Sequence, residues 1–112
     1  MKEQILTNVK KIQGINHTDF DNQIDSWINA GLLDLERLGI VSSFLSDSTD
    51  SEEESETEVN DLIVTAVTTY VLGFLDVPNA QMYMTSYKYQ ADTLRHIIEY
   101  IEASVEEWLN AI

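Results

Sequence analysis

The chain has 112 residues, of which 44% are hydrophobic, and its 20 acidic and 6 basic residues give a net charge of -14. This length suits one domain with a modest core, and the apolar fraction indicates a chain that folds. The charge argues against sequence-specific DNA binding, because duplex recognition depends on clustered Lys and Arg and the basic residues here are scattered along the sequence. The absence of cysteine excludes disulfides and thiolate metal sites.

The N-terminal segment MKEQILTNVKK is charged and lacks the apolar stretch of a signal peptide. No part of the sequence approaches the run of roughly 18 to 20 apolar residues that a membrane span needs. We therefore expect one soluble domain over residues 1–112 that stays inside the cell and has no membrane partner.

The first two predicted elements are helices. The segment KEQILTNVKKIQGI carries apolar residues at spacings of four and three, and Gly14 is expected to end its helix. The second helix is expected to be capped by Thr18 and to end at Gly39. Its apolar stripe consists of Phe20, Ile24, Trp27, Ile28, Gly31, Leu35 and Leu38.

An acidic segment, SDSTDSEEESETE, occupies residues 46–58 and contains no basic residue. Its Ser and Asp side chains compete with helical hydrogen bonds and its like charges repel, so it is predicted to be a mobile, solvated loop. The residues alone leave open whether this loop only solubilises the protein or has a further role. Its acidic residues are Asp47, Asp50, Glu52, Glu53, Glu54, Glu56 and Glu58.

Two longer helices are predicted after the acidic segment. The segment NDLIVTAVTTYVLGFLDVP has a wide apolar face, with a start at Thr57 or Asn60 and a stop at Pro78. The last helix starts after Asn79 and has a heptad pattern that reaches the final residue. We therefore predict an all-α fold, a small bundle of about four helices with the acidic loop between the second and third and a long C-terminal helix.

The heptad pattern of the last helix would extend about 45 Å, longer than a core of this size requires. Residues 97–112 are thus a predicted helical extension toward a partner, although the same pattern would also complete an intramolecular bundle. The candidate partner-binding residues are Ile101, Val105, Trp108, Leu109 and Ile112.

No catalytic residue, metal site or cofactor is predicted. His17 and His96 are the only imidazoles, and both are expected at the surface. Acidic pairs at helical spacing, such as Glu99 and Glu102, would bind magnesium only if they converged in a pocket. The acidic segment also lacks the central Gly and the regular ligand alternation of an EF-hand loop.

Three segments resemble a known family in the same order along the chain. DFDNQIDSWINAGLLDLERLGI, VNDLIVTAVTTYVLGFLD and MYMTSYKYQADTL are similar to the opening, central and last helices of the tailed-phage head-to-tail connector proteins, which are also called head-completion or adaptor proteins. The resemblance covers about residues 1–95. The acidic segment is longer than the corresponding loop of the family, and residues 97–112 run past its usual end.

The resemblance implies a structural subunit without enzymatic activity, in a ring of about a dozen copies beneath the portal protein of the virion. It implies assembly in the host cytoplasm, a stopper or tail-completion protein that docks onto the ring, and DNA that passes through without specific binding. The acidic segment would then repel DNA from the channel wall or dock onto the next protein. An acidic DNA-mimic inhibitor of a nucleic-acid enzyme and a magnesium-dependent nucleotide hydrolase stay open as alternatives.

Overall fold

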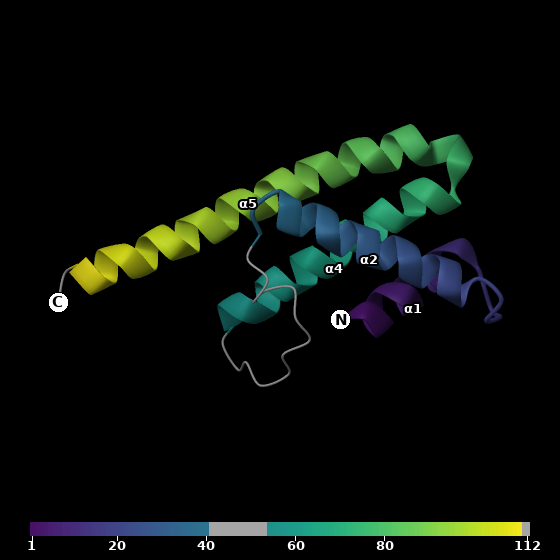
Figure 1. Cartoon of the computed structure of the whole chain (residues 1–112), viewed down its shortest axis with the longest axis horizontal. Coiled ribbons are helices and arrows are strands. Elements are labelled where there is room, and N and C mark those ends of the chain that lie inside the picture. The colour runs from purple at the N-terminus through teal and green to yellow at the C-terminus, as the bar shows by residue number, and fades with distance from the viewer. Residues whose placement is uncertain (41–53, 111–112) are drawn as a thin grey trace.

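The computed structural model describes residues 1–40 and 54–110, and these residues form helices joined by short turns (Figure 1). No strand is present in either range. The elements are α1 (Lys2–Gln13), α2 (Asp21–Arg37), α4 (Glu54–Leu75), the 3₁₀ turn η1 (Val77–Asn79) and α5 (Ala80–Asn110). The predicted all-α fold, a small bundle of about four helices with a long last helix, is confirmed.

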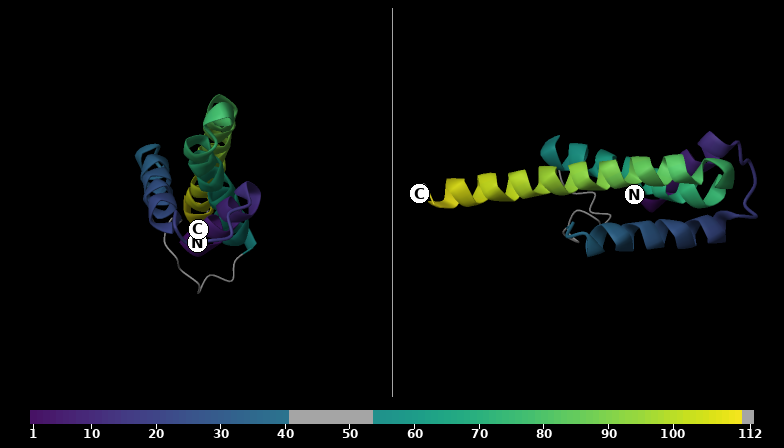
Figure 2. Two further views of the ribbon diagram at one scale, coloured as in Figure 1. Left: turned by 90° about the vertical axis from the view of Figure 1, so that its right-hand side faces the viewer. Right: turned by 90° about the horizontal axis from the view of Figure 1, so that it is seen from above.

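The central element is α4, which contacts α1, α2 and α5. The two views of Figure 2 show α5 running back along α4, with α1 and α2 on the remaining sides. A helix in this position must be apolar on several faces. Accordingly, Ile63 and Val67, which belong to the apolar face read from the spacing of this segment, are buried, and Val59, Val64 and Leu72 are buried as well.

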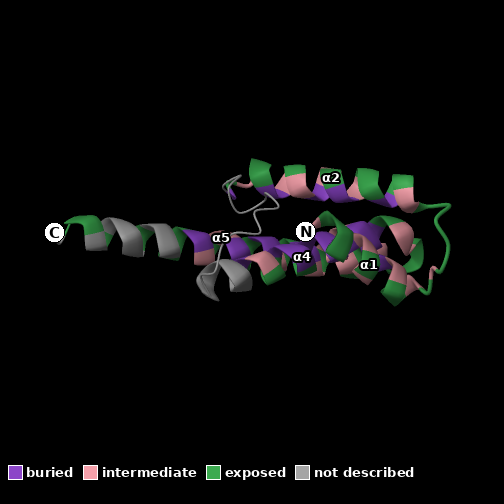
Figure 3. Ribbon diagram, turned by 90° about the horizontal axis from the view of Figure 1, so that it is seen from below, coloured by how far each residue is buried: buried purple, intermediate pink, exposed green. Residues whose placement is uncertain are grey.

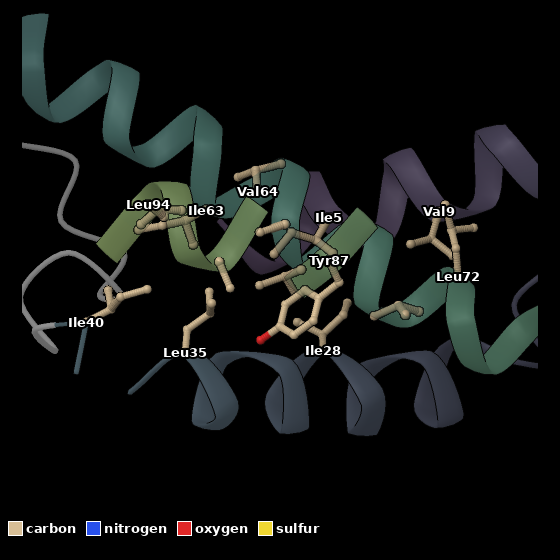
Figure 4. Close-up of a cluster of buried hydrophobic side chains, with 14 of the residues drawn as sticks. Ile5, Val9, Ile28, Leu35, Ile40, Ile63, Val64, Leu72, Tyr87 and Leu94 are labelled. Carbon is tan, nitrogen blue, oxygen red and sulfur yellow. The ribbon is translucent and has the colours of Figure 1, made fainter. Parts of the chain in front are cut away.

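One hydrophobic core joins the helices. Figure 3 shows that the buried residues of α2 lie on the side that faces α4, and Figure 4 shows side chains from all the helices pointing into the same space. The predicted stripe of the second helix is shorter than expected, because Phe20 lies just before α2 and is 50% exposed. The largest fully buried side chains are Ile5, Val9, Ile24, Ile28, Leu35, Ile40, Val59, Ile63, Val67, Val71 and Leu94.

Two glycines end the first two helices as predicted. Gly14 has a φ of 68° and allows the amide of Ile15 to donate a 2.8 Å hydrogen bond to the carbonyl of Lys10. Gly39 has a φ of 98°, and its amide donates to the carbonyl of Glu36. Both glycines occupy a backbone region that residues with a Cβ rarely adopt.

The predicted starts of two helices were wrong. Thr18 does not cap α2, which begins at Asp21, because the backbone carbonyl of Thr18 accepts from the amide of Asp21 in a tighter turn. α4 begins at Glu54, so residues 54–58 are helical and only residues before them could form the expected loop. Glu is a good helix former, and acidic residues in a first turn interact favourably with the helix dipole. Residues 46–53 lie outside the described residues.

No single helix of the described part of the chain is long and apolar enough to cross a membrane. The pair Val59–Leu75 and Val77–Tyr100, which is bent by 116° at the break between the two helices, meets the length and composition of a span only when both helices are taken together.

Candidate functional site

Side chains of α2, α4 and α5 line an open groove of about 380 Å³. Its floor is apolar and aromatic, and most of its rim is charged. We name it the basic groove, and its lining residues are Asp34, Arg37, Leu38, Tyr70, Met84, Tyr87, Lys88, Ala91, Asp92 and Arg95.

A hydrogen bond between Tyr87 and Asp34 joins α5 to α2 at the floor of the basic groove. The Tyr87 hydroxyl donates to Asp34 Oδ2 over 2.6 Å, and only 4% of Tyr87 is exposed. A hydroxyl that donates to a carboxylate at this distance forms a strong, charge-assisted hydrogen bond. The ring of Tyr87 also meets Tyr70 of α4 edge on, with ring centroids 5.0 Å apart. One side chain therefore ties three helices together.

The same carboxylate also pairs with Arg37, whose Nη2 lies 2.8 Å from Asp34 Oδ1. Burial alone would raise the pKa of Asp34, but hydrogen bonds from Tyr87 and Arg37 and the charge of Arg37 lower the pKa below its ordinary value. Burial, followed by the hydrogen bond to Asp34, raises the pKa of Tyr87 well above its ordinary value. Each group thus keeps one protonation state around neutral pH, which suits a structural contact.

The aromatic contacts continue from the groove along α2 and α4. Phe74 meets Tyr70 edge on at 5.1 Å and stacks on Trp27 of α2 at 5.8 Å. Gly31 makes this approach possible, because a Cβ at that position would lie only 3.0 Å from Tyr70 Cδ1. The absence of a side chain at Gly31 therefore sets how closely α2 and α4 approach.

The fold gathers Arg37, Lys88 and Arg95 around the groove, half of the 6 basic residues of the chain. Lys88 and Arg95 lie seven residues apart on one face of α5, and Arg37 reaches the groove from α2. None of the ion pairs within the described residues involves Lys88. Arg95 has only long contacts, 3.5 Å to Asp92 and 3.9 Å to Glu99. The sequence interpretation, which treated the basic residues as scattered, missed this convergence.

The second feature of interest is the end of α5, which projects beyond the other helices (Figures 1 and 2). The last buried residue of α5 that the structure describes is Ile98. We name residues 99–110 the α5 arm. Every residue of the arm whose burial is described is exposed: Glu99, Tyr100, Ala103, Glu107, Leu109 and Asn110.

The residues predicted to bind a partner fall partly on this arm. Leu109 is 58% exposed, whereas Ile101, Val105 and Trp108 are placed only by their backbone in α5 and Ile112 lies outside the described residues. Of the predicted acidic loop, Asp47, Asp50, Glu52 and Glu53 also lie outside them, and Glu54, Glu56 and Glu58 are placed only by their backbone in the first turns of α4.

Potential metal ligands do not converge in the part of the chain that the structure describes. No group of three or more His, Asp or Glu that could hold a metal ion is present there. His17 and His96 are at the surface, as predicted, with side chains 46% and 64% exposed. Glu99 is also exposed and contacts Arg95.

Comparison with known proteins gives one family match. A family model described as phage connector protein matches residues 5–104. No match was found among curated proteins or among solved structures. The matched range begins in α1 and ends within the α5 arm, so the family pattern extends further along α5 than the expected end near residue 95.

Proposed function

Because the chain belongs to the phage connector protein family, we propose that it is a structural subunit of the ring that joins the portal to the stopper or tail proteins of a tailed phage. Family membership makes the chain a structural component of the virion that assembles with other head and tail proteins. Within that role, we propose that about a dozen copies form a closed ring and that the ring assembles in the host cytoplasm. The family match over residues 5–104 is the observation that carries it.

The charge of the protein supports a conduit for DNA. A chain with a net charge of -14 repels a duplex, and a channel wall must let DNA slide past without holding it. We propose that the acidic segment, residues 46–58, faces either this channel or the next protein of the stack. DNA then passes through the ring without specific binding.

The shape of the protein supports contacts with neighbours. A 112-residue bundle has a small core, and its longest helix leaves the α5 arm exposed. An amphipathic helix of this kind can lay its apolar face into a groove of another protein. We propose that the arm, with Leu109 and the predicted contact residues Ile101, Val105, Trp108 and Ile112, binds another component of the connector.

We also propose that the protein catalyses no reaction. This proposal is supported by the titratable groups of the basic groove, because Asp34 already makes structural contacts with Tyr87 and Arg37. A general acid or base needs a pKa near the working pH, whereas the pKa values of Asp34 and Tyr87 are displaced away from neutrality in opposite directions.

The first test is the solution mass by light scattering, alone and with the portal protein of the same phage, at low and physiological salt. We expect a closed ring or a stoichiometric complex with the portal. A chain that stays monomeric in both samples contradicts the proposal. If that chain also competes with DNA for a nuclease, the DNA-mimic alternative replaces it.

A truncated chain without residues 104–112 tests whether the arm binds a partner or belongs to the hydrophobic core. We expect this variant to remain helical by circular dichroism and to lose its binding to the partner, because the described residues of the arm are exposed. A truncated chain that unfolds would mean that the arm belongs to the core.

A further inference from the structure

We propose that the α5 arm of one copy docks into the basic groove of a second copy, so that neighbouring subunits join head to tail. This inference rests on the proposed ring function and names the two surfaces of its lateral contact. Both surfaces are accessible to another molecule, since the groove is open and the described residues of the arm are exposed.

Charge is the first argument. The arm contains Glu99, Glu102, Glu106 and Glu107 and no basic residue. The basic groove has Arg37, Lys88 and Arg95 around it. The groove also contains Asp34 and Asp92, which pair with Arg37 and Arg95, so its three basic and two acidic residues leave a net charge of +1. Lys88 takes part in none of the ion pairs within the described residues. In a chain with a net charge of -14, a lining with a net positive charge is the exception, and it favours an acidic helix over the rest of the surface. Complementary potentials of this kind select the partner surface and its orientation.

The apolar parts of the two surfaces also correspond. The floor of the groove includes Leu38, Tyr70 and Met84, and the heptad spacing of the sequence places Val105 and Trp108 on one face of the arm. An apolar helix face in a hydrophobic groove is a common mode of recognition, and Trp is enriched among residues that dominate such contacts.

A second hollow fits the arm less well. It lies between α1 and α4, has a volume of about 240 Å³ and is lined by a single basic residue, Lys11, with three threonines. The two linings have the same net charge of +1, because Asp34 and Asp92 offset two of the three basic residues of the basic groove. The second hollow is smaller, however, and it lacks the aromatic side chains of the basic groove, against which the apolar face of a helix could pack. We use Lys11 below as a control position.

The arm cannot reach the groove of its own chain. Lys88 of the groove and Glu107 of the arm belong to the same uninterrupted helix, Ala80–Asn110, and lie about 28 Å apart along its axis at 1.5 Å per residue. Folding the arm back would break α5. The occupant of the groove is thus the arm of another molecule, and a contact between two different surfaces repeats from copy to copy until it closes into a ring or grows as a filament.

The test exchanges the charges of the two surfaces. Lys88→Glu/Arg95→Glu makes the groove acidic, and Glu106→Lys/Glu107→Lys makes the arm basic. Arg37 stays unchanged because it pairs with Asp34 inside the bundle. We expect each double variant alone to self-associate at least tenfold more weakly than the natural sequence, as measured by light scattering over a concentration series. An equimolar mixture should regain full association, since each altered groove then meets a complementary arm.

A matched control carries the same charge change elsewhere. Lys2 and Lys11 are exposed on α1, so Lys2→Glu/Lys11→Glu should associate as the natural sequence does, and circular dichroism should show the same helix content in every variant. A groove variant that associates like this control, or a mixture that does not regain association, overturns the inference.

The absence of cysteine allows a second measurement that does not depend on weakened binding. A chain with Lys88→Cys and Glu107→Cys cannot close an intramolecular disulfide, because bridged Cα atoms lie within about 7 Å. Under mild oxidation we expect a ladder of covalent multimers, with and without the portal protein, and we expect none with Lys11→Cys/Glu107→Cys. A ladder without portal binding would refute the proposed function alone. A portal complex without a ladder would refute the arm-in-groove contact alone.

Discussion

Replacement of Tyr87 by Phe removes the hydroxyl that joins α5 to α2 and leaves the ring in place against Tyr70. A hydrogen bond to a charged group contributes about 1.5 to 3 kcal/mol to stability. Asp34 keeps Arg37, and its side chain is 24% exposed, so water can replace part of the lost interaction. We therefore expect the free energy of unfolding to fall by about 1 to 2 kcal/mol at pH 7.

Urea unfolding followed by circular dichroism measures this change. The matched control is Tyr89→Phe, which removes a hydroxyl from a tyrosine that is 74% exposed and should change the free energy of unfolding by less than about 0.5 kcal/mol. The same experiment should be run below 1 μM, or on the truncated chain, so that self-association does not contribute to the measured stability.

The pKa shifts of Asp34 and Tyr87 predict how the stability difference between the natural sequence and Tyr87→Phe changes with pH. The pKa of Asp34 is lowered in the fold, so its contribution is complete above the unfolded-state pKa of about 3.9 and is lost as the pH falls through the lower folded value. The pKa of Tyr87 is raised, so the natural sequence loses stability as the pH rises above about 10, whereas Tyr87→Phe lacks that loss. The difference between the two proteins should therefore narrow at both extremes. Equal stabilities at pH 7, or a difference that does not depend on pH, would refute the reasoning.

Four further substitutions test the packing of the bundle by thermal and urea unfolding. Ile28→Ala empties part of a fully buried site and should cost about 2 to 5 kcal/mol, whereas Leu33→Ala, at a position that is 65% exposed, should cost far less. Gly31→Val should cost about 1 to 3 kcal/mol, because even a Cβ would lie 3.0 Å and 3.1 Å from side chains of α4. Gly73→Ala should instead add about 0.5 to 1 kcal/mol, since its Cβ would meet chiefly the flexible end of Met84, which can move aside. A stabilising Gly31→Val or a strongly destabilising Gly73→Ala would contradict these packing arguments.

The helices could be predicted because each one has an apolar face with a regular spacing. In α5 the heptad pattern includes Tyr87, Ala91, Leu94 and Ile98, and all four are buried. The predicted start of α4 lies several residues after the observed one at Glu54. The prediction considered the repulsion among the acidic residues but not their favourable interaction with the positive end of the helix dipole. Periodicity identifies the face of a helix but does not determine how far the helix slides along its neighbour.

That limit explains why the basic groove was not predicted. Arg37 and Lys88 lie far apart in the sequence, and their convergence depends on how α2 and α5 align, which the Asp34–Tyr87 hydrogen bond fixes. Asp34 was not singled out from the sequence, because nothing in the spacing of α2 distinguishes it from the other polar residues of that helix. The one available signal was the seven-residue spacing of Lys88 and Arg95, which places two positive charges on one face of an otherwise acidic helix.

The continuity of α5 determines how the arm can associate. An isolated helix of fewer than about 12 to 15 residues is marginal in water because its first turn is costly to form. In this chain the turns of α5 that pack on α4 nucleate the helix, and the arm only extends it. Ordering a residue of a flexible segment costs about 1 to 2 kcal/mol, and a preformed arm avoids most of that loss when it binds. The conformational entropy of the arm is thus lost during folding, before any neighbour is met, and the contact energy remains available for association.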